Sequence, residues 1–447
     1  MNTIIVSLGC HKNLVDTENM LGILKKNKNI NLITDPLKAD IAIINTCGFI
    51  NDAKEESINA ILEIAMNKEI GQLKKLIVTG CLAQRYSKEL MDEIPEIDAI
   101  LGTGEIEKIG KVIEEICYKE KIIEIENMEF ICNASTERLI TTPAHVAYIK
   151  IAEGCDMSCS YCIIPKLRGK FRSRSIEDII KEVENLVSIG VREFNIIAQE
   201  TTEYGRDIYG KKMLPELLEK ISKVDGVKWI KNFYTYPDDF SNELIQVIKN
   251  NDNICKYIDI PIQHVSESIL KKMKRNSNFE KIENILYNIR KEIPEAVFRT
   301  SLIVGFPGET EEDFQKLYDF TKKFEFDYVG IFKYSREEDT AAFDLSNQVD
   351  EEIKDERWTK LINLQNDIIN RKNLKYIDHI FDVIIDGVSE ESEFMLEGRT
   401  SFQAYDIDGK VLINDGTGKV GEIVKVKIEQ NFDYDLLGGI VENEFTE

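Results

Sequence analysis

The sequence has 447 residues, enough for two or three domains with separate cores, and its 43% hydrophobic and 31% charged residues are typical of a globular protein. No apolar run reaches the roughly 18 residues that a membrane span requires, so we predict no membrane segment and no membrane partner. The formal charge of −23 argues against a general nucleic-acid-binding protein, because phosphate contacts require a basic face, and favours a basic partner or none.

The first 120 residues predict an open parallel sheet in which each clear strand ends at a cysteine. Amphipathic helices such as 51–68 separate the strands, an alternation typical of βαβ units. The first strand begins without the basic and apolar regions of a signal peptide, so we expect a cytoplasmic protein. Ligands bind at the carboxyl ends of strands in open α/β sheets, so the cysteines are expected to converge. The strands are 3–10 with Cys10, 41–49 with Cys47, and 75–83 with Cys81.

Residues 141–372, after a connecting segment at 121–140, predict a second α/β region. Six strand patterns alternate with helical ones, and six βα units indicate a partial, TIM-like (β/α)6 barrel. The helix expected at 310–324 begins with a capping arrangement of Thr310 and Asp313. The strand patterns are 145–154, 193–200, 229–236, 257–263, 297–306 and 327–335.

The chain ends, from residue 374 to 447, in a predicted small all-β barrel that follows a long charged helix at 349–376. Short strands and turns replace the α/β alternation here. Residues 376–447 contain 17 acidic and five basic residues, a net charge of −12, so about half of the excess negative charge of the chain lies in this last unit.

A second set of three cysteines lies in the stretch "IAEGCDMSCSYCIIP", on the loop after the first barrel strand, where barrel active sites lie. Thiolates are soft ligands that favour zinc, copper(I) or iron–sulfur clusters. A structural zinc site and an electron-transfer cubane both use four ligands, whereas three thiolates leave one iron of a cubane open. The remaining cysteines, Cys117, Cys132 and Cys255, are expected to be buried apolar residues, and the four histidines show no metal-ligand spacing.

The spacing C-x-x-x-C-x-aromatic-C resembles the signature of the radical S-adenosylmethionine (SAM) enzymes, with Cys155, Cys159, Tyr161 and Cys162 at the matching positions. The resemblance implies a 4Fe-4S cluster whose open iron is chelated by SAM. It also implies that an electron from the reduced cluster cleaves SAM to a 5′-deoxyadenosyl radical, which removes hydrogen from an unreactive carbon. In such enzymes the cofactor carries the chemistry and the protein supplies position and shielding.

Further stretches of the barrel fit a SAM pocket. "SLIVGFPGET" resembles the segment of the family near the adenine and methionine moieties, although a plain turn before a helix would look similar. Two glutamines end buried strands and are either cofactor contacts or polar residues satisfied within the barrel top. The basic loop "KLRGKFRSRS" is either a solvated face or a binding site for the SAM carboxylate or an acidic substrate group. The predicted contacts are Tyr161, Gln199, Gln263, Gly305, Phe306 and Pro307.

The N-terminal cysteine set narrows the resemblance. "LGCHKNLVDTE", "NTCGFI" and "TGCLAQRY" are similar to the N-terminal domain of the methylthiotransferases, with Thr17 where serine is common. The order of a cluster domain, a radical SAM core and a C-terminal TRAM domain also matches. By this resemblance Cys10, Cys47 and Cys81 hold a second 4Fe-4S cluster, which carries the sulfur to be inserted, and Cys155, Cys159 and Cys162 hold the radical cluster. We assign no catalytic residue beyond these ligands.

Two branches of this family compete as substrate assignments. One modifies the β-carbon of an aspartate in the twelfth protein of the small ribosomal subunit, and the other modifies a tRNA adenosine. "IAQETTEYG", "YIDIPIQH" and "EGRTSFQAYDIDG" are similar to the ribosomal-protein branch, although Glu200 stands where that branch commonly has aspartate. A TRAM-like barrel with a net charge of −12 would repel tRNA and attract a basic ribosomal protein.

We therefore predict an aspartate methylthiotransferase that acts on a basic small-subunit ribosomal protein, with tRNA an unlikely partner. The reaction requires an electron donor, flavodoxin-like or similar, that the sequence does not identify. The alternatives are a tRNA methylthiotransferase, an iron–sulfur electron carrier or sensor, which the three-ligand sets disfavour, and a structural zinc module.

Overall fold

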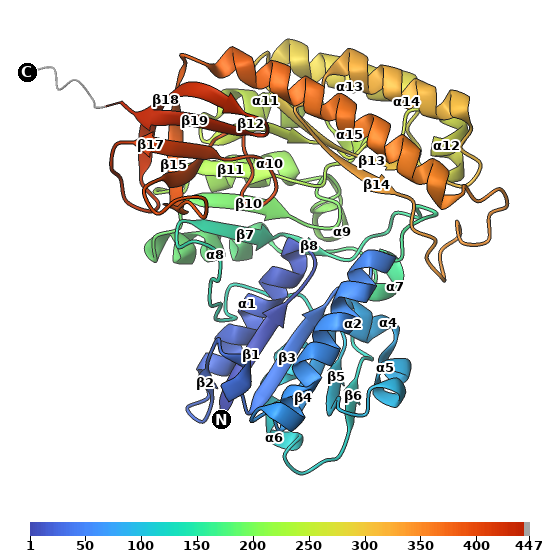
Figure 1. Cartoon of the computed structure of the whole chain (residues 1–447), viewed down its shortest axis with the longest axis vertical. Coiled ribbons are helices and arrows are strands. Elements are labelled where there is room, and N and C mark those ends of the chain that lie inside the picture. The colour runs from blue at the N-terminus through green and yellow to red at the C-terminus, as the bar shows by residue number, and fades with distance from the viewer. Residues whose placement is uncertain (442–447) are drawn as a thin grey trace, which may run out of the picture.

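The computed structural model describes residues 1–441, in which three units follow one another along the chain (Figure 1). The N-terminal unit is a six-stranded, fully parallel sheet of order β2-β1-β3-β4-β5-β6. Its strands are β1 (Asn2–Ser7), β2 (Asn31–Leu32), β3 (Ile41–Thr46), β4 (Lys75–Gly80), β5 (Ala99–Leu101) and β6 (Ile122–Glu124). Its helices are α1 (His11–Lys25), η1 (Pro36–Lys38), α2 (Asn51–Ala65), α3 (Asn67–Ile70), α4 (Cys81–Arg85), α5 (Ser87–Glu93), η2 (Ile106–Lys108) and α6 (Ile109–Glu115).

Helices cover both faces of this sheet. Successive residues of β3 alternate between two apolar cores: Ile44 packs with Ile61 of α2, and Ile43 packs with Met20 of α1. Continuous apolar strands buried on both faces are what a parallel sheet requires. Strand β6 pairs with β5, so the segment predicted as a connection, 121–140, begins with the edge strand of the N-terminal sheet.

The central unit is a parallel sheet of order β7-β10-β11-β12-β13-β14, which confirms the expected open (β/α)6 barrel. The strands are β7 (Val146–Lys150), β10 (Glu193–Ile197), β11 (Trp229–Asn232), β12 (Ile254–Asp259), β13 (Val297–Val304) and β14 (Tyr328–Lys333), with a short antiparallel pair of β8 (Ala152–Glu153) and β9 (Arg172–Ser173). The helices are α7 (Ile164–Arg168), α8 (Ile176–Ser188), α9 (Arg206–Tyr209), α10 (Leu214–Ser222), η3 (Pro237–Asp239), α11 (Asn242–Asn250), α12 (Glu267–Lys272), α13 (Phe279–Glu292), α14 (Glu311–Phe324), α15 (Glu351–Asn373) and, at the end of the unit, η4 (Leu374–Tyr376).

Helix α15 covers the free edge of the central sheet (Figure 1). Its Trp358 Nε1 donates to the carbonyl of Ile331 in β14 at 2.9 Å, and its Gln365 amide donates to the carbonyl of Asp327 at 3.0 Å. An edge strand with unpaired backbone groups is a site of aggregation, and a covering helix removes that hazard. Within residues 1–441 no helix is long and apolar enough to cross a membrane.

The C-terminal unit is a closed five-stranded barrel of order β15-β16-β17-β19-β18, as expected from its short strand patterns. Its strands are β15 (Ile380–Val388), β16 (Leu396–Thr400), β17 (Val411–Asp415), β18 (Ile423–Phe432) and β19 (Asp435–Ile440). The loop after β16 reaches the interior of the central barrel: Tyr148 Oη donates to the carbonyl of Tyr405 at 3.0 Å, and Tyr257 Oη donates to Asp408 Oδ2 at 2.7 Å.

Candidate functional site

The three N-terminal cysteines lie at the carboxyl ends of β1, β3 and β4, which are neighbours in the sheet. Asn13 in the first turn of α1 ties these ends together, because its Nδ2 donates to the carbonyls of Leu8 at 3.1 Å and Thr46 at 3.0 Å. Its Oδ1 lies 3.9 Å from the Sγ of Cys81. The sequence places the cysteines at strand ends, and the sheet order brings those ends side by side.

Two glycines let the cysteine loops approach one another. Gly9 has φ +83°, and a Cβ there would lie 2.6 Å from the Cβ of Cys47. A Cβ at Gly48 would lie 2.8 Å from the backbone nitrogen of Leu82, directly after Cys81. Glycine at these two positions therefore lets the cysteine-bearing loops pack against one another, which gathers three thiols into one donor set of the kind that binds a metal centre.

Burial disfavours free thiolates at Cys47, Cys155 and Cys162, whereas at Cys10 burial is outweighed by the charges of Lys12 and Arg168, which lower the pKa. Burial, and next the charge of Cys81, raise the pKa of Cys47 to about 12. Burial likewise raises the pKa of Cys155 and of Cys162 to about 12. A metal cation replaces the proton of a coordinating thiol, so groups of buried thiols of this kind fit metal ligation better than acid–base or nucleophilic work at neutral pH.

Cys155, Cys159 and Cys162 lie on the loop between β8 and α7. The backbone N–H of Cys155 donates to the carbonyl of Gly169 at 3.2 Å, and that of Cys162 donates to the carbonyl of Cys159 at 3.1 Å. Between them, Ser160 anchors the loop to the segment after α12, since its N–H donates to the carbonyl of Met273 at 3.0 Å. The loop is thus fixed at both ends and at its middle.

Apolar side chains at the start of α7 pack between the two cysteine sets. Cys81 packs in one apolar cluster with Ile163 and Leu167, and Ile163 directly follows Cys162. The hydroxyl of Thr103 in the N-terminal unit donates to the carbonyl of Leu167 at 2.7 Å. The two thiol sets therefore face the same interface between the N-terminal unit and the barrel.

A buried ion-pair network holds this interface. Arg168 Nη1 donates to Asp16 Oδ2 at 3.0 Å and to Glu153 Oε1 at 3.1 Å, and Lys150 Nζ donates to Glu153 Oε2 at 2.6 Å and also to Asp16. Burial opposes the charge, but Arg168 and Lys150 together lower the pKa of Glu153. The basic loop predicted as a solvated face or ligand site thus contributes Arg168 to structural ion pairs instead.

Two of the predicted SAM contacts meet in the structure. The ring of Tyr161 meets that of Phe306 edge-on at 6.4 Å between centroids. Phe306 lies in the turn between β13 and α14, where Gly305 has φ +72° and its position leaves no room for a side chain against Lys354. Pro307 occupies the same turn. These residues lie together beside the cysteine loop.

The two predicted glutamines lie apart from one another. Gln199 Nε2 donates to Glu153 Oε1 at 2.6 Å, while its Oε1 is buried without a hydrogen-bond partner within the described chain. Gln263 has φ +67° and its N–H donates to the carbonyl of Ser301 at 2.9 Å. Gln199 therefore belongs to the ion-pair network, and it keeps one free acceptor there.

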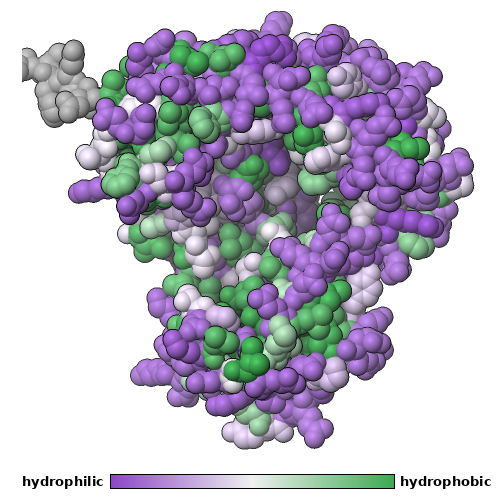
Figure 2. All heavy atoms as spheres, viewed as in Figure 1, coloured by the Kyte–Doolittle hydropathy of each residue, from purple (hydrophilic) through white to green (hydrophobic). Residues whose placement is uncertain are grey.

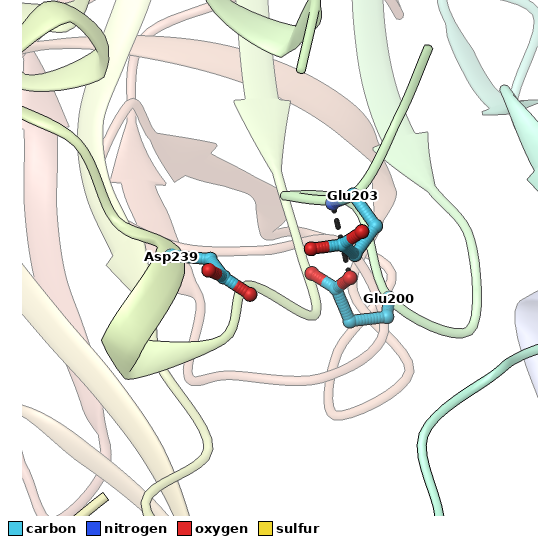
Figure 3. A group of neighbouring side chains, drawn as sticks. All are labelled: Glu200, Glu203 and Asp239. Carbon is cyan, nitrogen blue, oxygen red and sulfur yellow. Dashed lines mark hydrogen bonds between the residues drawn. The ribbon is translucent and has the colours of Figure 1, made fainter. Parts of the chain in front are cut away.

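Sequence reasoning did not assign a role to a carboxylate group beside Gln199. Oxygens of Glu200, Glu203 and Asp239 lie within 4.8 Å of one another (Figure 3). Lys212 bridges Glu203, at 2.7 Å, and Asp239, so their charge is already compensated. Burial raises the pKa of Glu200 to about 7, and its Oε2 accepts from the N–H of Glu203 at 3.0 Å. The sequence signal for this group is the pair of carboxylates, Glu200 and Glu203, that follows the buried strand β10.

Arg275 is a second functional candidate that the sequence reasoning missed. Its Nη1 donates to Tyr161 Oη at 3.3 Å, and its guanidinium lies 4.3 Å from the ring centre of Tyr236. It lines a cavity of ≈ 490 Å³ together with Ser158 of the cysteine loop. The sequence signal was the basic run "KKMKRNSN" at 271–278, which covers the end of α12 and the residues after it.

Three family models match the chain, one for each unit. The radical SAM superfamily matches residues 149–321, the uncharacterized protein family UPF0004 matches residues 2–102, and the TRAM domain matches residues 378–441. The radical SAM match implies SAM and one 4Fe-4S cluster, and it spans the loop that carries Cys155, Cys159 and Cys162.

Solved structures share the fold at low sequence identity. The radical SAM methyltransferase TsrM from Kitasatospora setae is 12% identical with a TM-score of 0.53, covering 74% of this chain and 72% of that chain. The cobalamin-dependent radical SAM enzyme OxsB is 14% identical with a TM-score of 0.52, covering 83% of this chain and 56% of that chain.

Curated relatives match over nearly their whole length. The ribosomal protein uS12 methylthiotransferase RimO of Clostridioides difficile is 51% identical over 436 residues, 97% of this chain and 98% of its own. The protein of the same name from Geobacter sulfurreducens is 49% identical over 438 residues, 98% of each chain. With this identity over three matching units, the chain belongs to the ribosomal protein uS12 methylthiotransferase family of radical SAM enzymes.

Proposed function

We propose that this chain inserts a methylthio group at the β-carbon of an aspartate in ribosomal protein uS12. The observation that supports it most strongly is the pair of three-cysteine sets on the two sides of α7. The proposed substrate belongs to the ribosome, so the proposed reaction takes place in the cytoplasm. The relatives at about half identity are named for uS12, and none of these names supports the tRNA alternative.

Each cysteine set has a proposed role. Cys155, Cys159 and Cys162 hold the radical 4Fe-4S cluster, which supplies the electron that cleaves SAM. Cys10, Cys47 and Cys81 hold a second cluster, which binds the sulfur to be transferred. Three thiols in each set leave one iron without a protein ligand. The buried thiols support both assignments, and the close packing of the loops at Gly9 and Gly48 supports the second.

The proposed SAM site uses residues around the cysteine loop. Tyr161, Phe306 and the Gly305–Pro307 turn shape its apolar wall. Gln263 at the end of the neighbouring strand and the free acceptor of Gln199 are its polar contacts. To these we add Glu200, a buried carboxylate that suits the amino group of SAM, and Arg275, a buried guanidinium that suits its carboxylate.

The acidic C-terminal barrel supports a basic protein substrate. Its described surface exposes a series of carboxylates: Glu390, Glu391, Glu393, Asp406, Asp415, Glu429 and Asp433. The negative electrostatic potential of these carboxylates accelerates association with a basic ribosomal protein and repels the phosphates of tRNA.

We propose that the electron donor binds at a positively charged surface, the opposite of the acidic C-terminal barrel. Lys271, Lys272 and Lys274 are exposed at and after the end of α12, and the carbonyl of Lys272 accepts a hydrogen bond from the Ser160 hydroxyl at 2.7 Å. This lysine patch (Lys271, Lys272 and Lys274) thus contacts the radical cysteine loop directly. On a chain of net charge −23, it suits an acidic one-electron carrier, flavodoxin-like or similar.

The test combines product analysis with one substitution in each cysteine set. Reconstituted enzyme is incubated with SAM, sulfide, reductant and either uS12 or tRNA, and the products are measured by mass spectrometry. We expect methylthio-aspartate in uS12. Cys159→Ala should abolish SAM cleavage, whereas Cys47→Ala should retain 5′-deoxyadenosine formation and lose methylthio transfer. Methylthio-adenosine in tRNA with unmodified uS12 would contradict the proposed function, and full transfer by Cys47→Ala would contradict the second cluster.

A further inference from the structure

Lys12 is a buried lysine that has no acidic partner within the described residues 1–441. Four lysines of the described chain are almost completely buried, and three of them have carboxylate partners: Lys150 with Glu153, Lys231 with Glu193 and Lys354 with Glu351. Lys12 is 8% exposed, and within residues 1–441 no carboxylate lies at ion-pair distance from it. A buried charge is costly unless an anion compensates it, and besides the nearby thiol of Cys10 an anionic ligand would suit this position.

The ammonium of Lys12 rests on the ring of Tyr234, 3.4 Å from the ring centre. Tyr234 follows β11 and has φ +59°, a left-handed conformation that is strained for a side chain of this size. Surrounding groups enforce it: the N–H of Tyr234 donates to Asp259 Oδ2 at 2.7 Å, and its carbonyl accepts from the N–H of Thr201 at 3.0 Å. A fixed aromatic face stabilises a cation without neutralising it, so the ammonium remains able to bind an anion.

Lys12 lies where the N-terminal unit enters the mouth of the barrel. The first turn of α1 reaches the central sheet (Figure 1), and the face is hollowed between the barrel and the N-terminal unit (Figure 2). His11 stacks on Tyr148 of β7, with ring centroids 4.0 Å apart. Lys12 follows Cys10 by two positions, and Tyr234 stands at the carboxyl edge of the barrel, the edge that carries the radical cysteine loop. The ammonium is therefore close to Cys10 and lies at the barrel edge that carries the radical cysteine loop.

We propose that Lys12, held on Tyr234, binds the side-chain carboxylate of the aspartate that the enzyme modifies. The inference rests on the proposed function, since it concerns the substrate of the same site. The carboxylate is bonded to the β-carbon that reacts, so its capture by Lys12 selects aspartate and orients that carbon between the two cysteine sets. A basic protein is attracted by the acidic C-terminal barrel, and its acidic side chain is then selected by this single buried cation.

The test compares uS12 carrying aspartate with uS12 carrying asparagine at the target position. Loss of a hydrogen-bonded ion pair of this kind should lower substrate affinity by about tenfold to hundredfold. For Lys12→Gln we expect a fall of that size in kcat/KM for the aspartate substrate, mainly through KM, and a loss of the preference for aspartate over asparagine. Cleavage of SAM to 5′-deoxyadenosine should persist. The control is Lys25→Gln, a change at an exposed lysine on the same helix. It should leave kcat/KM for both substrates unchanged.

The ring is tested separately, in variants that leave α1 intact. Tyr234→Phe keeps the aromatic face and should behave like the wild type, whereas Tyr234→Leu should weaken the aspartate preference. An unchanged preference in both Lys12→Gln and Tyr234→Leu would overturn the proposal. So would a Lys12→Gln variant that shifts the reduction potential of the N-terminal cluster and keeps the preference, because Lys12 would then compensate the cluster charge.

Failure of the proposed function gives a different result. If wild-type enzyme transfers no methylthio group to uS12 while it modifies tRNA, the proposed function is wrong whatever Lys12 does. If Lys12→Gln loses iron, Tyr234→Leu alone decides the question, since it changes neither the cysteines nor their neighbours in sequence.

Discussion

At the scale of single residues, buried charges mark where the units join. Glu193 of β10 is fully buried and accepts hydrogen bonds from Lys231 Nζ at 2.8 Å and from Arg399 Nη2 of the C-terminal barrel at 2.8 Å. Burial opposes ionisation, but Arg399 and next Lys231 lower the pKa of Glu193 to about 2. One carboxylate thus fixes the C-terminal barrel to the central one.

Glu193→Gln should lower the free energy of unfolding by about 3 kcal/mol, because it leaves two buried cations facing a neutral amide. Since the folded pKa lies below the usual value of 4.5, the contribution of Glu193 is fully present above pH 4.5 and is lost as the pH falls toward 2. The loss measured by denaturant unfolding should therefore be constant between about pH 6 and pH 8. The control Glu219→Gln, at a half-exposed residue that pairs only with the exposed Lys223, should change stability by at most about 0.5 kcal/mol.

At the scale of elements, strong local patterns were predictable and short or tertiary-dependent ones were not. The capping box of α14 is confirmed: Thr310 Oγ1 accepts from the N–H of Asp313, and Asp313 Oδ2 accepts from the N–H of Thr310 at 3.0 Å. The sequence predicts a connection at 121–140, whereas the structure forms strand β6 there, because three residues carry no measurable alternation and only their pairing with β5 defines them as a strand. Likewise, the sequence of α12 does not show that its end contacts the radical cysteine loop through Lys272 and Ser160, because this contact is tertiary.

The lysine patch at the end of α12 leads to a prediction about electron transfer. Lys271→Glu with Lys274→Glu should slow turnover driven by an acidic protein donor by at least about tenfold at low salt, and raising the salt should reduce the difference. Turnover driven by dithionite should remain unchanged. Lys228→Glu, an exposed lysine at the amino end of β11, serves as the matched control. Equal losses with both reductants would show that the patch does not bind the donor.

At the scale of the whole molecule, a clamp closes the N-terminal unit onto the barrel. Glu337, after β14, accepts from Arg85 Nη1 at 2.7 Å and from Lys54 Nζ at 2.8 Å, and its side chain is 2% exposed. On the other side of the interface, Arg138 pairs with Glu18. The clamp joins the unit that carries the first cysteine set to the unit that carries the second, and neither Glu337 nor Arg138 is bonded to a cysteine.

Glu337→Ala should uncouple the two half-reactions. SAM cleavage should stay within about twofold of the wild type, while methylthio transfer falls at least about tenfold, since roughly 1.4 kcal/mol of lost docking energy suffices. The ratio of 5′-deoxyadenosine to methylthiolated product measures this, and small-angle X-ray scattering should show a larger radius of gyration. Asp339→Ala on the same loop removes only an exposed ion pair. It should change neither the product ratio nor the radius of gyration. An equal fall in 5′-deoxyadenosine and in methylthiolated product would contradict this role of the Glu337 clamp.

The sequence by itself determined the order of the three units, the partial barrel, the all-β end and the two cysteine sets, because periodicity and spacing are local properties of the chain. Only the tertiary structure decided that Arg168 forms buried ion pairs, that Glu200 and Arg275 border the cysteine loop, and that Lys12 rests on Tyr234 with no carboxylate partner in residues 1–441. These contacts join residues far apart in the chain, and their energies depend on burial and on neighbouring charges, which no local pattern records.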